Sequence, residues 1–140
     1  MDGYPKTAAC VCGALTATVA TPPAVVHACA CLDCQRRTGS AFSYSAFFAE
    51  DAVTLYGQFT TFRRTADSGR AHDSSFCPAC GCTVFYRLEG LPGVIGVPVG
   101  CFGDAAFEKP GTLYWSLRRH QWLATPAGVA ENERQKRQNR

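Results

Sequence analysis

The chain has 140 residues and a mass of 15.1 kDa, a length typical of one domain with a substantial hydrophobic core. A hydrophobic content of 46% excludes a disordered or fibrous chain, and no apolar run reaches the roughly 18 residues of a membrane span. The net charge is +3, and most of it lies in the basic residues of the last ten positions. The nearly neutral remainder argues against nucleic-acid binding. Because no charged-then-apolar signal segment begins the chain, we expect a cytoplasmic protein with no membrane or nucleic-acid partner.

The residue pattern along the chain predicts a mainly β fold with short helical turns. Apolar and threonine residues alternate over residues 15–19, which is typical of a strand, and Pro22-Pro23 ends this pattern. An apolar run at residues 25–30 leads into cysteines, and residues 35–40 predict a helical turn that Gly39 keeps short. Further strands are predicted where β-branched and aromatic residues gather, at residues 43–48, 53–55, 59–64, 83–87 and 94–99. Turns are expected between them, at Gly57, Ser68-Gly69, Gly90 and Pro92-Gly93.

The composition changes near the carboxyl end, where apolar residues become scarce. We therefore expect one domain over residues 1–126 and a polar tail over residues 127–140. The tail is interpreted as frayed chain or a solvated helix. Thirteen glycines and eight prolines leave no room for a long helix before residue 127.

Nine cysteines are the extreme feature of this composition. In a cytoplasmic chain thiols stay reduced, so a disulfide framework is the poorer explanation. Seven of the nine fall into close groups with the spacing of metal ligands, at Cys10, Cys12, Cys29, Cys31, Cys34, Cys77 and Cys80. The sequence therefore predicts metal binding, with zinc as the expected ion.

Two of these groups form the halves of one predicted site. Cys10 and Cys12 are two residues apart, so a strand would present both sulfurs on one face. Cys77 and Cys80 form a C-x-x-C turn followed by Gly81, which lets the backbone wrap closely around an ion. Together they predict a closed Cys₄ structural zinc that staples distant parts of the chain, with four ordinary buried cysteines as the alternative.

The middle group differs because Cys29, Cys31 and Cys34 supply three thiolates without an obvious fourth ligand. Three protein ligands and an open position are the layout of a catalytic zinc, suited to binding an exogenous thiolate. The alternative is a second closed site, completed by a distant residue such as Cys82, Cys101 or His72. Spacing alone leaves both interpretations open, although Cys82 and Cys101 are better interpreted as small core residues.

Residues 29–42 read CACLDCQRRTGSAF and resemble the signature of the glutathione-dependent formaldehyde-activating enzyme family, which includes centromere protein V. The motifs at residues 10–14 and 76–81 resemble the flanking motifs of that family in the same order. The resemblance implies a zinc-stapled β-tent fold. It also implies two zinc ions: a structural one on Cys10, Cys12, Cys77 and Cys80, and a catalytic one on Cys29, Cys31 and Cys34. Residues 100–104 depart from the family pattern, which leaves the pocket wall undefined.

The activity that the resemblance implies is a carbon–sulfur lyase reaction, the reversible condensation of glutathione, or a similar thiol, with formaldehyde or another small aldehyde. Arg37 is a candidate for binding a glutathione carboxylate, because arginine forks bind carboxylates bidentately, and Ser40 is a candidate for lining the site. No strong general acid is evident, with His72 and His120 as candidate proton donors. The alternative is a non-catalytic zinc module for thiol carriage or protein interaction.

Overall fold

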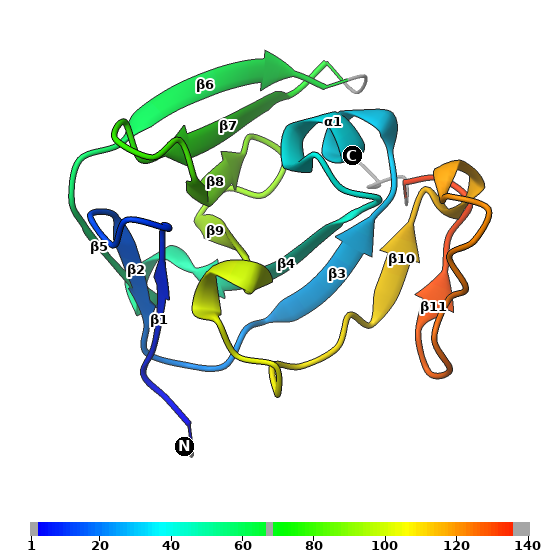
Figure 1. Cartoon of the computed structure of the whole chain (residues 1–140), viewed down its shortest axis with the longest axis horizontal. Helices are drawn as coiled ribbons and strands as arrows, with labels where there is room; N and C mark the ends of the chain where they lie inside the picture. The colour runs from blue at the N-terminus through cyan, green and yellow to red at the C-terminus, as the bar shows by residue number, and fades with distance from the viewer. Residues whose placement is uncertain (1–2, 67–68, 136–140) are drawn as a thin grey trace. The chain divides into compact units, whose positions relative to one another are not determined.

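The computed structural model of the chain describes residues 3–66 and 69–135 (Figure 1). It confirms the mainly β prediction, with eleven strands, one α-helix and three short 3₁₀ helices in the described residues. Ser68 of the predicted Ser68-Gly69 turn and the last five residues of the predicted tail lie outside the described residues. None of the helices in the described part of the chain has the length and apolar character needed to cross a membrane.

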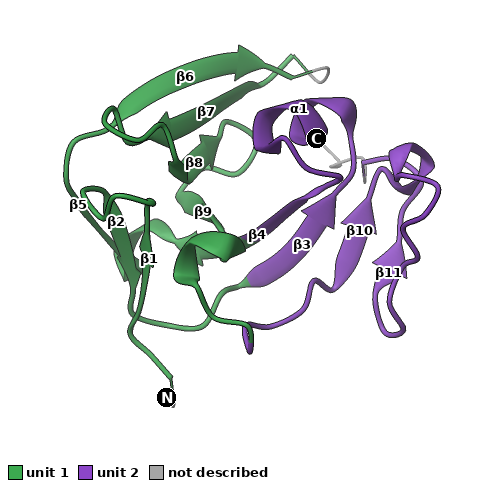
Figure 2. Ribbon diagram, in the orientation of Figure 1, with its two compact units in different colours: residues 1–24, 46–105 green, residues 25–45, 106–140 purple. Residues whose placement is uncertain are grey.

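The chain forms two compact units, residues 1–24 with 46–105 and residues 25–45 with 106–140 (Figure 2). Each unit contains one of the cysteine groups predicted to bind metal. Strand β4 (Ser43–Ala49) begins in the second unit and ends in the first. The predicted domain at residues 1–126 and its boundary with a tail stay a prediction.

The first unit contains two sets of antiparallel strands. One is a three-stranded sheet in the order β1-β2-β5, made of β1 (Lys6–Ala9), β2 (Thr16–Val19) and β5 (Val53–Tyr56). The other runs in the order β9-β8-β7-β6, with β6 (Thr60–Thr65), β7 (Ala71–Phe76), β8 (Thr83–Leu88) and β9 (Val94–Pro98). The 3₁₀ helices of this unit are η1 (Glu50–Ala52) and η2 (Val99–Phe102).

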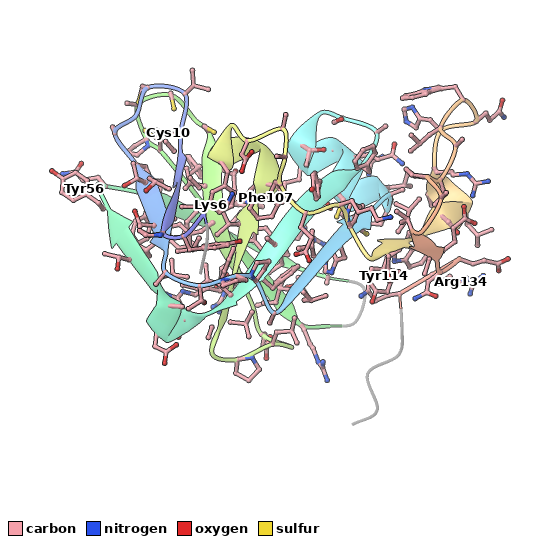
Figure 3. The ribbon with its side chains drawn as sticks, turned by 90° about the horizontal axis from the view of Figure 1, so that it is seen from below. Lys6, Cys10, Tyr56, Phe107, Tyr114 and Arg134 are labelled. Carbon is pink, nitrogen blue, oxygen red and sulfur yellow. The ribbon has the colours of Figure 1, made fainter. Side chains whose placement is uncertain are left out.

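Alternating side chains explain the core of the first unit. Ala17 and Val19 of β2 are fully buried, as the period-two pattern predicts, while Tyr56 at the end of β5 is 75% exposed (Figure 3). Gly96 of β9 lies against the ring of Tyr86, where a Cβ atom would come within 2.4 Å of the ring. This glycine therefore allows β8 and β9 to pack closely around an aromatic side chain.

The second unit contains parallel strands in the order β11-β10-β3, made of β3 (Val25–Cys29), β10 (Thr112–Tyr114) and β11 (Ala130–Glu131). Ala28, Ala30 and Leu113 form its buried cluster, and Val129 packs against them. Val129 is partly buried and β11 pairs with β10, so residues 127–135 are neither a helix nor frayed chain. For these residues the interpretation as a frayed or helical tail was wrong, because the backbone pairing of a two-residue strand needs little apolar sequence.

The helix of the second unit begins earlier than the sequence predicted. Helix α1 spans Leu32–Thr38, and Cys31 caps its first turn by accepting a hydrogen bond from the Cys34 amide. Gly39 ends the helix in the left-handed conformation at φ 65°, as its position predicted. The 3₁₀ helix η3 (Ser116–Arg118) follows β10.

Candidate metal centres

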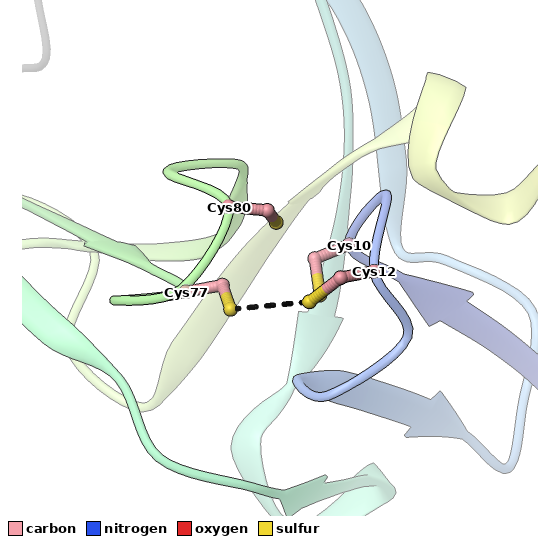
Figure 4. A group of neighbouring side chains, drawn as sticks. All are labelled: Cys10, Cys12, Cys77 and Cys80. Carbon is pink, nitrogen blue, oxygen red and sulfur yellow. Dashed lines mark hydrogen bonds between the residues drawn. The ribbon is translucent and has the colours of Figure 1, made fainter.

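Four cysteines of the first unit converge from two turns, and we call them the four-cysteine cluster. Cys10 (Figure 3) and Cys12 lie in the turn after β1, and Cys77 and Cys80 lie in the turn after β7. Figure 4 shows the four side chains directed toward one another. Both turns contain a glycine with positive φ, Gly13 and Gly81 at 80° and 77°. These glycines allow the reversals of the chain that bring the sulfurs together.

The distances within the four-cysteine cluster fit a tetrahedral ion. The Cys12 Sγ atom lies 3.6 Å from that of Cys10 and 3.7 Å from that of Cys77. All four sulfurs lie within 4.8 Å of one another. Sulfurs at about 2.3 Å from a zinc ion and at tetrahedral corners would be about 3.8 Å apart. The cluster can therefore hold a zinc ion without rearrangement.

The surroundings of the four-cysteine cluster favour a negative charge on two of its sulfurs. The Leu15 amide donates to Cys10 Sγ at 3.3 Å and lowers the pKa of that thiol. Hydrogen bonds with the backbone of Cys12 and Cys82 lower the pKa of Cys80 to about 6. The backbone at Ala14 also lowers the pKa of Cys12, but the neighbouring thiols outweigh it and raise this pKa to about 11. Backbone dipoles thus stabilise part of the negative charge that a Cys₄ site requires.

Three cysteines of the second unit form the three-cysteine cluster. Cys29 ends β3, Cys31 caps α1 and Cys34 lies in the first turn of that helix. Their sulfurs lie within 4.8 Å of one another, and no further Cys, His, Asp or Glu joins this group in residues 3–66 and 69–135. Three thiolates on one side fit a zinc site that keeps one coordination position for another ligand.

Negative charge in the three-cysteine cluster concentrates on Cys34. Hydrogen bonds from the Cys29 and Cys31 thiols hold the pKa of Cys34 far below its usual range. The Ser43 hydroxyl and the positive charge of Arg37 act in the same direction. The hydrogen bonds that Cys29 makes with the Cys31 and Cys34 sulfurs raise its own pKa well above its usual range. The three sulfurs are therefore arranged around one stabilised thiolate, which is the form that binds a metal.

An open hollow of about 440 Å³ lies in the second unit, and part of its wall is the chain that follows the three-cysteine cluster. None of the three cysteines lines it, but Gln35, one of its wall residues, directly follows Cys34 in the chain. Ser43 donates a hydrogen bond to the Cys29 carbonyl at 3.4 Å. The residues that line the hollow are Gln35, Arg36, Gly39, Ser40, Ala41, Phe42, His120 and Trp122.

The sequence profile of the glutathione-dependent formaldehyde-activating enzyme family matches residues 5–122, most of the chain and both cysteine clusters. The chain belongs to this family. No curated protein matches it.

The fold of this family member is also that of a solved structure. A crystal structure of a Rhodobacter sphaeroides protein, a structural genomics target, superposes on the chain with a TM-score of 0.58 at 22% sequence identity. The match covers 74% of this chain and 97% of that one. This similarity extends to the fold alone.

The predicted substrate residues of this family member lie in different surroundings. Ser40 lines the hollow, whereas Arg37 is half-buried and its positive charge lowers the pKa of Cys34. Arg36 is the arginine on the wall of the hollow. Of the candidate proton donors, His120 lines the hollow, but His72 is buried in the first unit and stacks on the Tyr86 ring at 5.0 Å.

The two remaining cysteines are outside both clusters. The thiols of Cys82 and Cys101 both donate to the Thr83 carbonyl, at 3.8 and 3.4 Å. Burial raises the pKa of Cys101 to about 12, which favours its neutral thiol.

The sequence analysis did not identify Gln35, a wall residue of the hollow. Nothing in the local sequence indicates that a glutamine contacts a residue far along the chain.

Proposed function

We propose that the protein catalyses the reversible condensation of glutathione with formaldehyde to S-(hydroxymethyl)glutathione. The family match supports the reaction class, and the three-cysteine cluster carries the proposal. No fourth Cys, His, Asp or Glu joins its sulfurs in the described residues, and residues that follow Cys34 in the chain form part of the wall of an open hollow of about 440 Å³.

The two clusters would hold one zinc ion each, a structural ion at Cys10, Cys12, Cys77 and Cys80 and a catalytic ion at Cys29, Cys31 and Cys34. At the second site, bound zinc would stabilise an added sulfur ligand as a thiolate at neutral pH. The chain supports this site through Ser43, whose hydroxyl stabilises the Cys34 thiolate, and through the Cys31 cap of α1.

Two arginines beside the three-cysteine cluster match the two carboxylates of glutathione. Arg36 presents an exposed side chain on the wall of the hollow, and Arg37 lies nearer to Cys34. A guanidinium group binds a carboxylate through two parallel hydrogen bonds. The Ser40 hydroxyl offers a further hydrogen-bond partner on the same wall. Binding the peptide in this way would hold its thiol near the reacting carbonyl carbon and so raise the rate by proximity.

Exchange spectroscopy by NMR tests the proposal, because it measures interconversion of glutathione and its hydroxymethyl adduct at equilibrium. The zinc-loaded protein should accelerate this exchange above the spontaneous rate, and Cys31→Ser should abolish the acceleration. Cys101→Ser is the matched control, since Cys101 lies outside both clusters and serine can still donate to the Thr83 carbonyl. Glutathione binding without acceleration would instead assign thiol carriage to the site.

A further inference from the structure

A glutamine side chain connects the loop of the three-cysteine cluster to the wall of the hollow. The Gln35 Nε2 amide donates to the Ala30 carbonyl at 2.8 Å and to the Arg118 carbonyl at 3.0 Å. Ala30 is the residue between Cys29 and Cys31. Because both partners are acceptors, they fix the orientation of the amide and turn its Oε1 atom away from them.

The Oε1 atom of this amide is within hydrogen-bond distance of His120. Gln35 Oε1 lies 3.0 Å from His120 Nε2, and a carbonyl oxygen can only accept a hydrogen bond. His120 Nε2 must therefore carry the hydrogen, which leaves Nδ1 as the lone-pair nitrogen of the neutral ring. The Trp122 ring meets the imidazole edge-on, with centroids 6.3 Å apart and an interplanar angle of 82°. These two contacts hold an exposed imidazole on the wall of the hollow.

The other two histidines are in surroundings unsuited to proton exchange with a ligand. His72 is buried, and its Nδ1 atom lies 3.3 Å from the Ser74 hydroxyl. Burial lowers the pKa of His27 to about 4, and its ring packs edge-on against Tyr114. Among the three histidines of the chain, His120 is the one that both lines the hollow and is exposed.

We propose that His120 is the proton-transfer residue of the hollow and that Gln35 is a positioning residue that selects its tautomer. The inference rests on the proposed condensation reaction. His120 Nδ1 takes the proton that the glutathione thiol loses on becoming a thiolate, and the thiolate sulfur then forms its bond to the formaldehyde carbon. The π electron pair of the carbonyl moves to oxygen, and the oxygen then takes the proton from Nδ1. The imidazole returns to its neutral state, so thiol and aldehyde give the hydroxymethyl adduct with no other reactant. The reverse reaction follows the same steps backwards.

Nitrogen-15 NMR of the imidazole tests the tautomer without any measurement of activity. The wild-type protein should show His120 in one neutral tautomer with its hydrogen on Nε2. Gln35→Met has nearly the same size but no polar atoms, so it should give a mixture of the two tautomers. A wild-type ring with its hydrogen on Nδ1, or a spectrum that Gln35→Met leaves unchanged, would overturn the role of Gln35.

The same exchange assay tests the proton transfer. His120→Ala should slow the catalysed exchange about 100-fold, the lower end of what general acid–base catalysis contributes. Added imidazole should restore part of the rate in His120→Ala and leave the wild-type rate unchanged. An unchanged rate in His120→Ala, or a loss that imidazole does not restore, would overturn the role of His120 while the proposed reaction stands. A wild-type protein without any acceleration would overturn both.

Discussion

The four-cysteine cluster and the three-cysteine cluster are built from the same side chain in different ways. In the first, two turns that follow separate strands each supply two sulfurs, and Cys12 and Cys77 are 65 positions apart in the sequence. In the second, all three sulfurs come from one strand end and the adjoining helix turn. With zinc bound as proposed, a site assembled from distant segments would stabilise the fold, whereas a local site with an unused position would be available for chemistry. The number and origin of the ligands, rather than their type, distinguish the two proposed roles.

The largest effect is expected at the four-cysteine cluster. Cys77→Ser removes a buried sulfur from a site whose metal binding is coupled to folding. Because such binding contributes on the order of 10 kcal/mol, the variant should unfold or lose most of its stability. Thermal melting followed by circular dichroism measures this, together with the zinc content. An unchanged melting temperature with zinc retained at this cluster would refute the ligand assignment.

A contrasting result is expected at the three-cysteine cluster. Cys31→Ser should lose one zinc ion and the glutathione-dependent activity but keep most of the fold, because the site does not join distant strands. Serine can still accept the capping hydrogen bond from the Cys34 amide, so α1 is preserved. Circular dichroism with metal analysis separates these effects. Global unfolding of Cys31→Ser would indicate a second structural zinc and remove the contrast between the clusters.

A smaller effect is expected for substrate binding. Arg37→Ala should weaken glutathione binding by roughly 1.5–3 kcal/mol, as loss of a charge-assisted hydrogen bond implies, and leave the zinc content unchanged. Arg37→Lys should recover only part of the loss, because lysine lacks the planar fork. Calorimetry measures the binding free energy of each variant for glutathione and for a thiol that lacks both carboxylates. Equal losses for both thiols would show that the variant disturbed the zinc loop through Cys34.

The smallest effect concerns the helix that carries Cys34. Gly39 ends α1 at φ 65°, and no atom lies near a Cβ built there, so Gly39→Ala introduces conformational strain alone. A cost of about 1 kcal/mol in the free energy of unfolding is expected. Gly100→Ala is the matched control, because its Cβ also meets open space and its φ is not positive. Urea denaturation should separate the two variants, and equal stabilities would contradict this explanation of the helix end.

Local patterns in the sequence predicted much of this structure. Alternation predicted β2, and cysteine spacing predicted both clusters, because ligands two or three residues apart are positioned by short segments of chain. Strand β7 was missed because its sequence AHDSSF is polar, although His72, Ser74 and Ser75 are buried in the fold. The pairing of β7 with its neighbouring strands determines which of its side chains are buried, and the local sequence does not reveal that pairing.

The wall of the hollow was beyond sequence reasoning for a similar reason. Gln35 and His120 are separated by 85 residues, and each alone resembles ordinary surface. Arg36 and Arg37 are adjacent, and only the helix position decides which one reaches the hollow and which one lies toward Cys34. Contacts between distant polar side chains leave no periodic signal, so the structure was needed to find them.

Cadmium-113 NMR of the cadmium-substituted protein tests most directly the claim that one cluster is closed and the other open. Four-sulfur and three-sulfur sites give separate resonances, because the shift of the nucleus depends on the number of thiolates. The protein should show one resonance of each kind, and added glutathione should move only the second into the four-sulfur range. Two four-sulfur resonances before glutathione is added, or no response to it, would contradict the claim.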